Sequence, residues 1–224
     1  MTLSTICPLL LATPFAASLL ELTLELVPLI VKVGRLIVAF RRDTVTPATS
    51  HAFERDLQKL LRDIGRVIVG WVYNHLETAD LKQAPELIHY DHHVYRRRPV
   101  SLRRGGIATL FGIIGLRRIR YEPCDAGIGL TCIFPLEQRL GIVVGKATAA
   151  LANRVGMWTA QYTQEAVLAL LREEHDVTWS VATLRKVAAD LSTALAPWTH
   201  QAQVDYVLAL LQKAHASKGA HRPS

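Results

Sequence analysis

Residues 99–122 read PVSLRRGGIATLFGIIGLRRIRYE, and this stretch decides the mixed character of the fold. Apolar residues recur at about every second position, which is the period of a half-buried β-strand. Four glycines divide the stretch into the segments PVSLRR, IATLFG and LRRIRYE; they are Gly105, Gly106, Gly112 and Gly115. The pattern predicts a small antiparallel sheet.

The same region holds most of the chain's positive charge. The chain has 224 residues and a net charge of +7. Residues 96–120 contain no Lys, Asp or Glu, and they include eight arginines: Arg96, Arg97, Arg98, Arg103, Arg104, Arg117, Arg118 and Arg120. The remaining 199 residues therefore carry a net charge of −1. Guanidinium groups bind phosphates in a planar, bidentate geometry, so this cluster predicts phosphate contacts.

The last segment places arginines on both faces of one strand. Leu116, Arg118 and Arg120 alternate with Arg117 and Ile119, and successive side chains of a strand point to opposite faces. A strand that packs only on its own core would not carry arginines on both sides. We interpret the segment as a ribbon lying on a phosphate backbone.

Helices are expected on both sides of the sheet, which makes the fold mainly α with a small antiparallel β-sheet. Residues 6–40 are rich in Leu, Val and Ile, and Pro28 should kink or split their helix. Because this helix is apolar over most of its circumference, we expect it to be buried against other helices or to self-associate. The alternative is a helix that lies at a membrane interface. A second, amphipathic helix should begin after the capping residues Thr49 and Ser50 and end near Glu77.

After an irregular segment, the helical period returns at residue 147. We expect helices over 146–161, over 164–175 behind Thr163, over 179–195 behind Thr178, and over 201–216. The chain thus divides into an apolar helical segment (1–45), a long amphipathic helix and linker (46–95), an arginine-rich ribbon with a degenerate cysteine knuckle (96–140), and a helix-turn-helix bundle with a tail (141–224).

Two of these helices form a predicted helix-turn-helix, since only residues 176–178 separate them. Leu184, Val187, Ala188, Leu191 and Leu195 make the inward stripe of the second helix. The opposite face carries small and basic groups that can enter a major groove, and its candidate DNA-binding residues are Trp179, Thr183, Arg185 and Lys186.

Catalytic and metal sites are not expected. The sequence has no Gly-rich phosphate loop, GxSxG or HExxH, and the histidines lie near no nucleophile pattern. Cys124 and Cys132 lack the paired spacing of a zinc site, so we predict no metal and no cofactor. Three cysteines without such spacing favour a cytoplasmic location.

The order of these features resembles the N-terminal half of bacterial Kra-type insertion-sequence transposases. The resemblance covers about residues 49–224 and rests most specifically on FPLEQRLG (134–141) and on TQEAVLALLREEHDVTWSVATLRKVAADL (163–191). It implies binding to the inverted repeats of an insertion element. The family continues into a DDE catalytic domain at about the point where this sequence ends, so we expect no strand-transfer activity. The family's CPxCG-like knuckle is also missing, because Asp125 follows Cys124.

We therefore expect a protein that binds double-stranded DNA as the end-recognition portion of a truncated or split transposase and that self-associates through residues 6–40. The alternative is a structural or membrane-peripheral protein whose apolar start anchors it while the arginines bind anionic lipid. A third possibility is a non-functional remnant of a broken element.

Overall fold

The structure is a computed structural model that describes residues 14–78, 80–124 and 130–194, together with positions 196, 204, 205, 207 and 208. It is mainly helical with a small antiparallel sheet, which confirms the predicted fold class. The elements are α2 (Pro14–Arg42), α3 (Pro47–Asn74), a 3-10 turn (Leu81–Gln83), β1 (Leu87–Tyr90), β2 (His93–Thr109), β3 (Gly112–Pro123), α4 (Pro135–Arg139), α5 (Ala149–Thr159), α6 (Gln164–His175) and a last helix over 181–194. The helix predicted over 201–216 lies largely outside the described residues.

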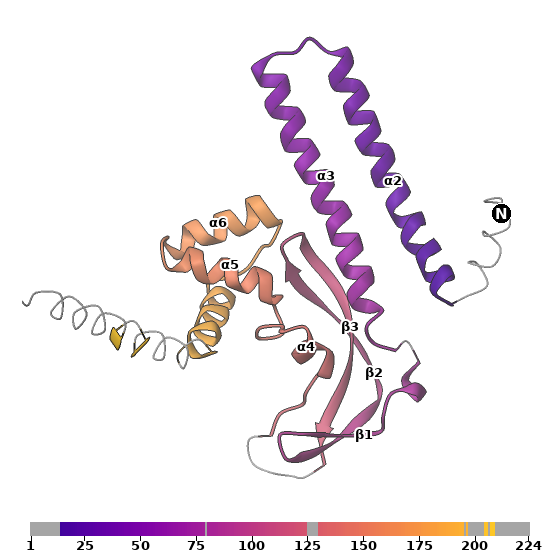
Figure 1. Cartoon of the computed structure of the whole chain (residues 1–224), viewed down its shortest axis with the longest axis vertical. Coiled ribbons are helices and arrows are strands. Elements are labelled where there is room, and N and C mark those ends of the chain that lie inside the picture. The colour runs from indigo at the N-terminus through magenta and orange to yellow at the C-terminus, as the bar shows by residue number, and fades with distance from the viewer. Residues whose placement is uncertain are drawn as a thin grey trace, which may run out of the picture.

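Helices α2 and α3 form a long antiparallel hairpin whose loop end stands away from the sheet, while the end of α3 lies beside β3 and α2 forms the outer side (Figure 1). The hairpin is joined near both ends. Phe40 stacks on Phe53 with ring centroids 4.4 Å apart, and the indole of Trp71 donates to the carbonyl of Ser18 at 3.0 Å. Helix α2 is continuous through Pro28, so of the kink or split that was predicted, the split is wrong. Proline removes a single backbone hydrogen bond, and the packing along α3 maintains the helix on either side of it.

Helix α3 begins earlier than predicted. Its N-cap is Thr46, followed by Pro47 in the first turn, and Thr46 and Thr49 exchange side-chain hydrogen bonds with each other's backbone in a capping box. Thr49 therefore lies inside the first turn and does not itself cap the helix. The helix ends at Asn74 with His75 as C-cap, close to the predicted end at Glu77.

The sheet has the order β1-β2-β3, and two of its features differ from the prediction. Gly105 and Gly106 do not end a strand; they lie inside β2, opposite Leu116 and Gly115. The side chain of Arg118 occupies the space where a Cβ of Gly105 would be, which explains the glycine there. Strand β1 was not predicted from the sequence; it pairs with β2 across a turn whose residues Asp91 and His92 both have positive φ.

The open edge of β3 is covered by the end of α3. The Asn74 side chain accepts from the Arg117 backbone N–H at 2.7 Å and donates to the Gly115 carbonyl at 2.9 Å. Glu77 accepts from the Ile119 N–H at 3.0 Å. These side chains satisfy strand-edge groups that would otherwise pair with another chain.

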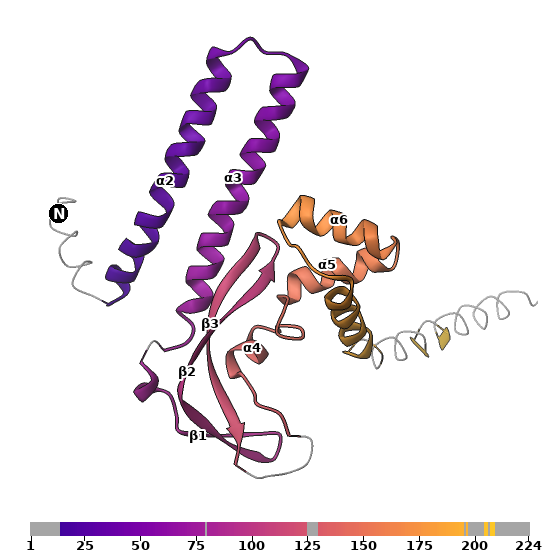
Figure 2. The ribbon, with the colours of Figure 1, turned by 180° about the vertical axis from the view of Figure 1, so that it is seen from behind.

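The largest core lies where the sheet meets the C-terminal helices. Leu151 and Val155 of α5, Val167 and Leu171 of α6, and residues of the last helix surround Ala108 of β2 and are all buried. Figure 2 shows these helices gathered on the side of the sheet opposite α2. The core thus fixes the C-terminal bundle to the sheet.

Candidate nucleic-acid interface

Arg118 of β3 points into the protein and pairs there with Glu137. Its guanidinium lies over the Phe134 ring, 5.0 Å from the centroid, and bonds to Glu137 of α4. The two charged side chains are only 11% and 14% exposed. Both partners belong to the FPLEQRLG segment, which therefore packs against the arginine strand.

Arg117, on the opposite face of β3, turns toward the end of α3. Its guanidinium donates to the Asn74 carbonyl at 2.9 Å, where the last carbonyls of the helix lack helical partners and the helix dipole favours a cation. Contacts within the protein therefore explain why β3 carries arginines on both of its faces. Phosphate contact by Arg117 and Arg118 stays a prediction, but their geometry does not favour it.

The other arginines of the ribbon differ in exposure. Arg98 and Arg120 both pair with Glu122, at 2.6 and 2.7 Å, and the Arg98 side chain is 57% exposed. Arg96 is exposed and Arg97 is half-buried. The side chains of Arg103 and Arg104 lie outside the described part of the chain. Among the described ribbon arginines, Arg96 and Arg98 are the ones presented to solvent.

The predicted helix-turn-helix is present as α6, residues 176–180 and the helix over 181–194. Thr163 caps α6 as predicted, with its side chain accepting from the Ala166 N–H. Asp176 ends α6 in the left-handed conformation, which Asp adopts more readily than most residues. Val177 is completely buried and ties the turn to the core.

The last helix begins later than predicted, and its cap is Ser180, not Thr178. The Ser180 hydroxyl accepts from the Thr183 N–H at 3.2 Å. The sequence carried this signal, since serine is among the preferred N-cap residues. Leu184 and Val187 are buried and Leu191 packs against the same core, which confirms the inward stripe within the described residues.

Two of the four candidate DNA-binding residues are exposed on the outward face of the last helix. Arg185 and Lys186 are exposed, and the Arg185 Nε donates to the Gln164 side chain at 3.0 Å, which orients its guanidinium. Trp179 instead packs against the core. It precedes the helix, so the position assigned to it on the outward helical face was wrong. Thr183 is half-buried and its hydroxyl bonds to Ser180.

The C-terminal bundle is held against α3 by basic side chains. Arg62 donates to the Glu173 carbonyl at 2.5 Å, and Arg66 pairs with Asp63 and, at 3.5 Å, with Asp176. These contacts lie at the C-terminal end of α6, where cations are favoured. They join α3 to the end of α6, the first helix of the helix-turn-helix.

His175 joins the same end of α6 to the tip of the β2–β3 hairpin. Its Nδ1 lies 2.8 Å from the Leu110 carbonyl, and its ring stacks on Trp158. The side chain is buried, and desolvation lowers the pKa of His175 below its usual value. The neutral ring therefore donates to the hairpin tip as a structural contact.

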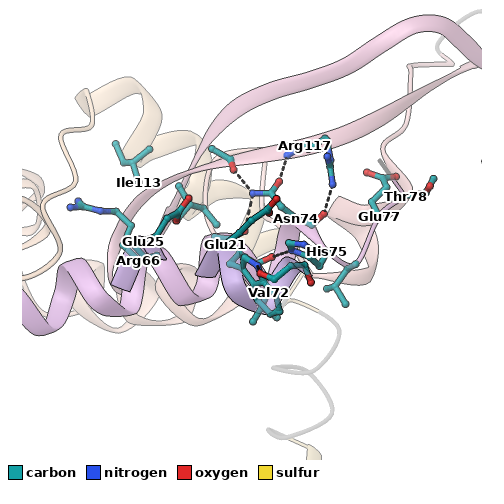
Figure 3. Close-up of a pocket in the computed structure, with 17 residues that line it drawn as sticks. Glu21, Glu25, Arg66, Val72, Asn74, His75, Glu77, Thr78, Ile113 and Arg117 are labelled. Carbon is teal, nitrogen blue, oxygen red and sulfur yellow. Dashed lines mark hydrogen bonds between the residues drawn. The ribbon is translucent and has the colours of Figure 1, made fainter. Parts of the chain in front are cut away.

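A groove of about 1210 Å³ lies between the ends of α2 and α3 and the middle of β3 (Figure 3). Its lining mixes the carboxylates Glu21, Glu25 and Glu77 with Arg66 and Arg117. Burial raises the pKa of Glu77 above its ordinary value. The mixed charge does not suit a phosphate backbone. Among the described residues, no three His, Cys, Asp or Glu side chains gather as metal ligands would.

Comparisons with known proteins leave the family open: no protein-family model, no curated protein and no solved structure matches the chain. No helix in the described ranges combines the length and the apolar character that crossing a membrane requires.

Proposed function

We propose that this chain binds double-stranded DNA through its C-terminal helix-turn-helix. The observation that carries the proposal is the helix over 181–194, which buries Leu184 and Val187 and leaves Arg185 and Lys186 exposed on its outer face. A helix anchored in this way can enter a major groove with its first turns against the bases. The contacts of Arg62 with Glu173 and of Arg66 with Asp176 support it, because they join α3 to the end of α6, the first helix of the motif.

The ribbon arginines supply a second set of contacts in this proposal. Arg96 and Arg98 are exposed on β2, and cations of this kind bind phosphates without reading sequence. The net charge of +7 favours association with a polyanion. Base recognition would then belong to the last helix, while the ribbon adds affinity.

The experiment is a titration of duplex DNA by the full chain between ~50 and ~200 mM salt, read by fluorescence anisotropy. Binding should weaken steeply as salt rises, and R96A/R98A should reduce the slope of log K against log salt by about 1.8, because each of these arginines is proposed to contact a phosphate. Replacing Arg185 and Lys186 by Ala should weaken binding and relax the preference among sequences, because these side chains are proposed to contact bases. The matched control is R41A/R42A, which removes two exposed charges at the far end of α2. A salt-independent response, or equal losses in the control, would exclude the proposal.

We further propose that the DNA recognised is the end of an insertion element, as the resemblance to Kra-type transposases implies. The support is the resemblance of FPLEQRLG and the helix-turn-helix segment to that family, together with an outward helix face able to read bases. Selection of bound duplexes from a random pool tests this point. A recurring motif found in the inverted repeats of such elements is expected, and enrichment of no sequence would reject end recognition while leaving general DNA binding intact.

The exposed apolar side of α2 favours a second candidate function, peripheral binding to anionic membranes. Leu24 and Ile30 are 65% and 59% exposed, as in a helix that lies at a lipid interface. Flotation with phosphatidylserine vesicles tests it. Flotation that is lost in L24E/V31E, in a chain that binds no DNA, would favour this function over the first.

A further inference from the structure

We infer that α2 is a dimerisation helix that packs antiparallel against α2 of a second copy of this chain. The inference concerns assembly and does not depend on DNA binding. Helix α2 carries two apolar seams, each with the alternating spacing of four and three residues found in paired helices. One seam faces α3 and is half-buried; its residues are Leu22, Leu26, Leu29, Val33, Leu36 and Phe40.

The second seam lies on nearly the opposite side of α2 and is open to solvent. Its residues are Leu20, Leu24, Val27, Val31, Gly34 and Val38, and the five apolar side chains among them are 45% to 65% exposed. Ile30 and Ile37 widen the same face. In Figures 1 and 2 this helix forms the outer side of the hairpin, away from the sheet and the bundle. An apolar stripe of this length with a heptad period fits another helix.

The seam is complementary to itself when the second helix runs in the opposite direction. Centred on residue 29, such a pair places Leu20 opposite Val38, Val27 opposite Val31, and Leu24 opposite Gly34 of the other copy. Leu24 is the most exposed side chain of the seam, whereas a Cβ on Gly34 would have no neighbour within 4 Å. In this pair the protruding Leu24 side chain faces the open space beside Gly34 of the other copy, as in knobs-into-holes packing.

The flanking charges select the same orientation. Glu21 and Glu25 lie in the first half of α2 and Lys32 and Arg35 in the second half. An antiparallel pair brings Glu21 beside Arg35, twice by the two-fold symmetry, whereas Glu25 and Lys32 lie farther from the seam. A parallel pair would lose this contact and would place Leu24 against Leu24 and Gly34 against Gly34. Charge complementarity therefore commits the seam to a second copy in the antiparallel arrangement.

The first test measures the mass of the full chain in solution by sedimentation equilibrium. Wild type should sediment as a dimer of 24.9 kDa chains, and L24E/V31E should be monomeric with unchanged helical circular dichroism. V45E is the matched control, because Val45 is 68% exposed but lies off the seam; it should remain dimeric. A monomeric wild type, or a dimer that survives L24E/V31E, would overturn the inference.

Charge reversal and crosslinking test the orientation. E21R alone should weaken the dimer about tenfold, and E21R/R35E should restore it. In a chain with Cys7, Cys124 and Cys132 replaced by Ser, L20C should form a disulfide with V38C in a mixture but none with itself. Self-crosslinking of L20C would indicate a parallel pair and reject the antiparallel one. A monomeric chain that floats with vesicles through α2 would show that lipid, not a second copy, covers the seam.

Discussion

Arg118 on β3 and Lys186 on the last helix carry the same charge in opposite surroundings. Arg118 is 11% exposed and pairs with Glu137, whereas Lys186 lies on the outer face of a helix whose other face is buried. The first cation stabilises the fold, and the second is available to a partner. A cluster of basic residues therefore identifies a nucleic-acid surface only after the partners of each side chain are known.

The largest expected effect tests the structural role of Arg118. Replacing Glu137 by Ala removes one partner of an ion pair whose two side chains are only 11% and 14% exposed, which should lower the free energy of unfolding by about 3–5 kcal/mol. Urea denaturation measures the loss. E122A is the control, since its ion pairs with Arg98 and Arg120 are more exposed, and it should lose about 1 kcal/mol or less. A loss in E137A no larger than in E122A would mean that the buried Arg118–Glu137 pair stabilises the fold no more than the exposed pairs of Glu122 do.

A smaller effect is expected where Arg117 meets α3. N74A removes the acceptor of the Arg117 N–H and the donor to the Gly115 carbonyl, and should cost about 1–3 kcal/mol. DNA affinity of the folded protein should not change, because the contact lies within the fold. N153A, at an exposed position of α5, should leave stability within about 0.5 kcal/mol. Weaker DNA binding by folded N74A would instead place the β3 edge in the interface.

Two glycines of α3 allow a test of how this helix packs near the tip of the β2–β3 hairpin. The tip lies between the arginine ribbon and the C-terminal bundle. A Cβ on Gly65 would overlap the Phe111 ring, whereas one on Gly70 would meet Ile114 at an ordinary 3.7 Å. G65A should therefore destabilise the protein by about 1–2 kcal/mol, and G70A should stabilise it by about 0.5–1 kcal/mol. Thermal unfolding of both variants gives the comparison. Stabilisation by G65A would mean that Phe111 does not pack there.

The smallest effect concerns His175, which links the bundle to the same tip. Its pKa is lowered in the folded state by burial, so the unfolded chain binds its proton more readily. The stabilisation is complete above the unfolded pKa of about 6.5 and declines as the pH falls below it. The difference in unfolding free energy between wild type and H175Q should therefore shrink from pH 7 to pH 5. A difference in unfolding free energy that stays constant from pH 7 to pH 5 would contradict the lowered pKa of His175 in the folded state.

Part of this architecture could be predicted because it depends on local pattern. The period of two over 99–122, the Thr163 cap and the inward positions Leu184 and Val187 all follow from neighbours within a few residues, and the structure confirms them. Strand β1 was missed because its four residues carry no clear alternation. Its turn depends on two non-glycine residues with positive φ, which no composition rule signals strongly.

The sequence by itself determined the mainly α fold class, the helix-turn-helix segment and the location of the positive charge. Only the tertiary structure decided which cations face solvent, because Glu137 and Asn74 are 19 and 43 residues from their arginine partners. Long-range pairs of this kind leave no periodic trace in the chain. The same holds for the two seams of α2: both are visible in the sequence, but the packing of α3 against one of them determines which seam stays exposed.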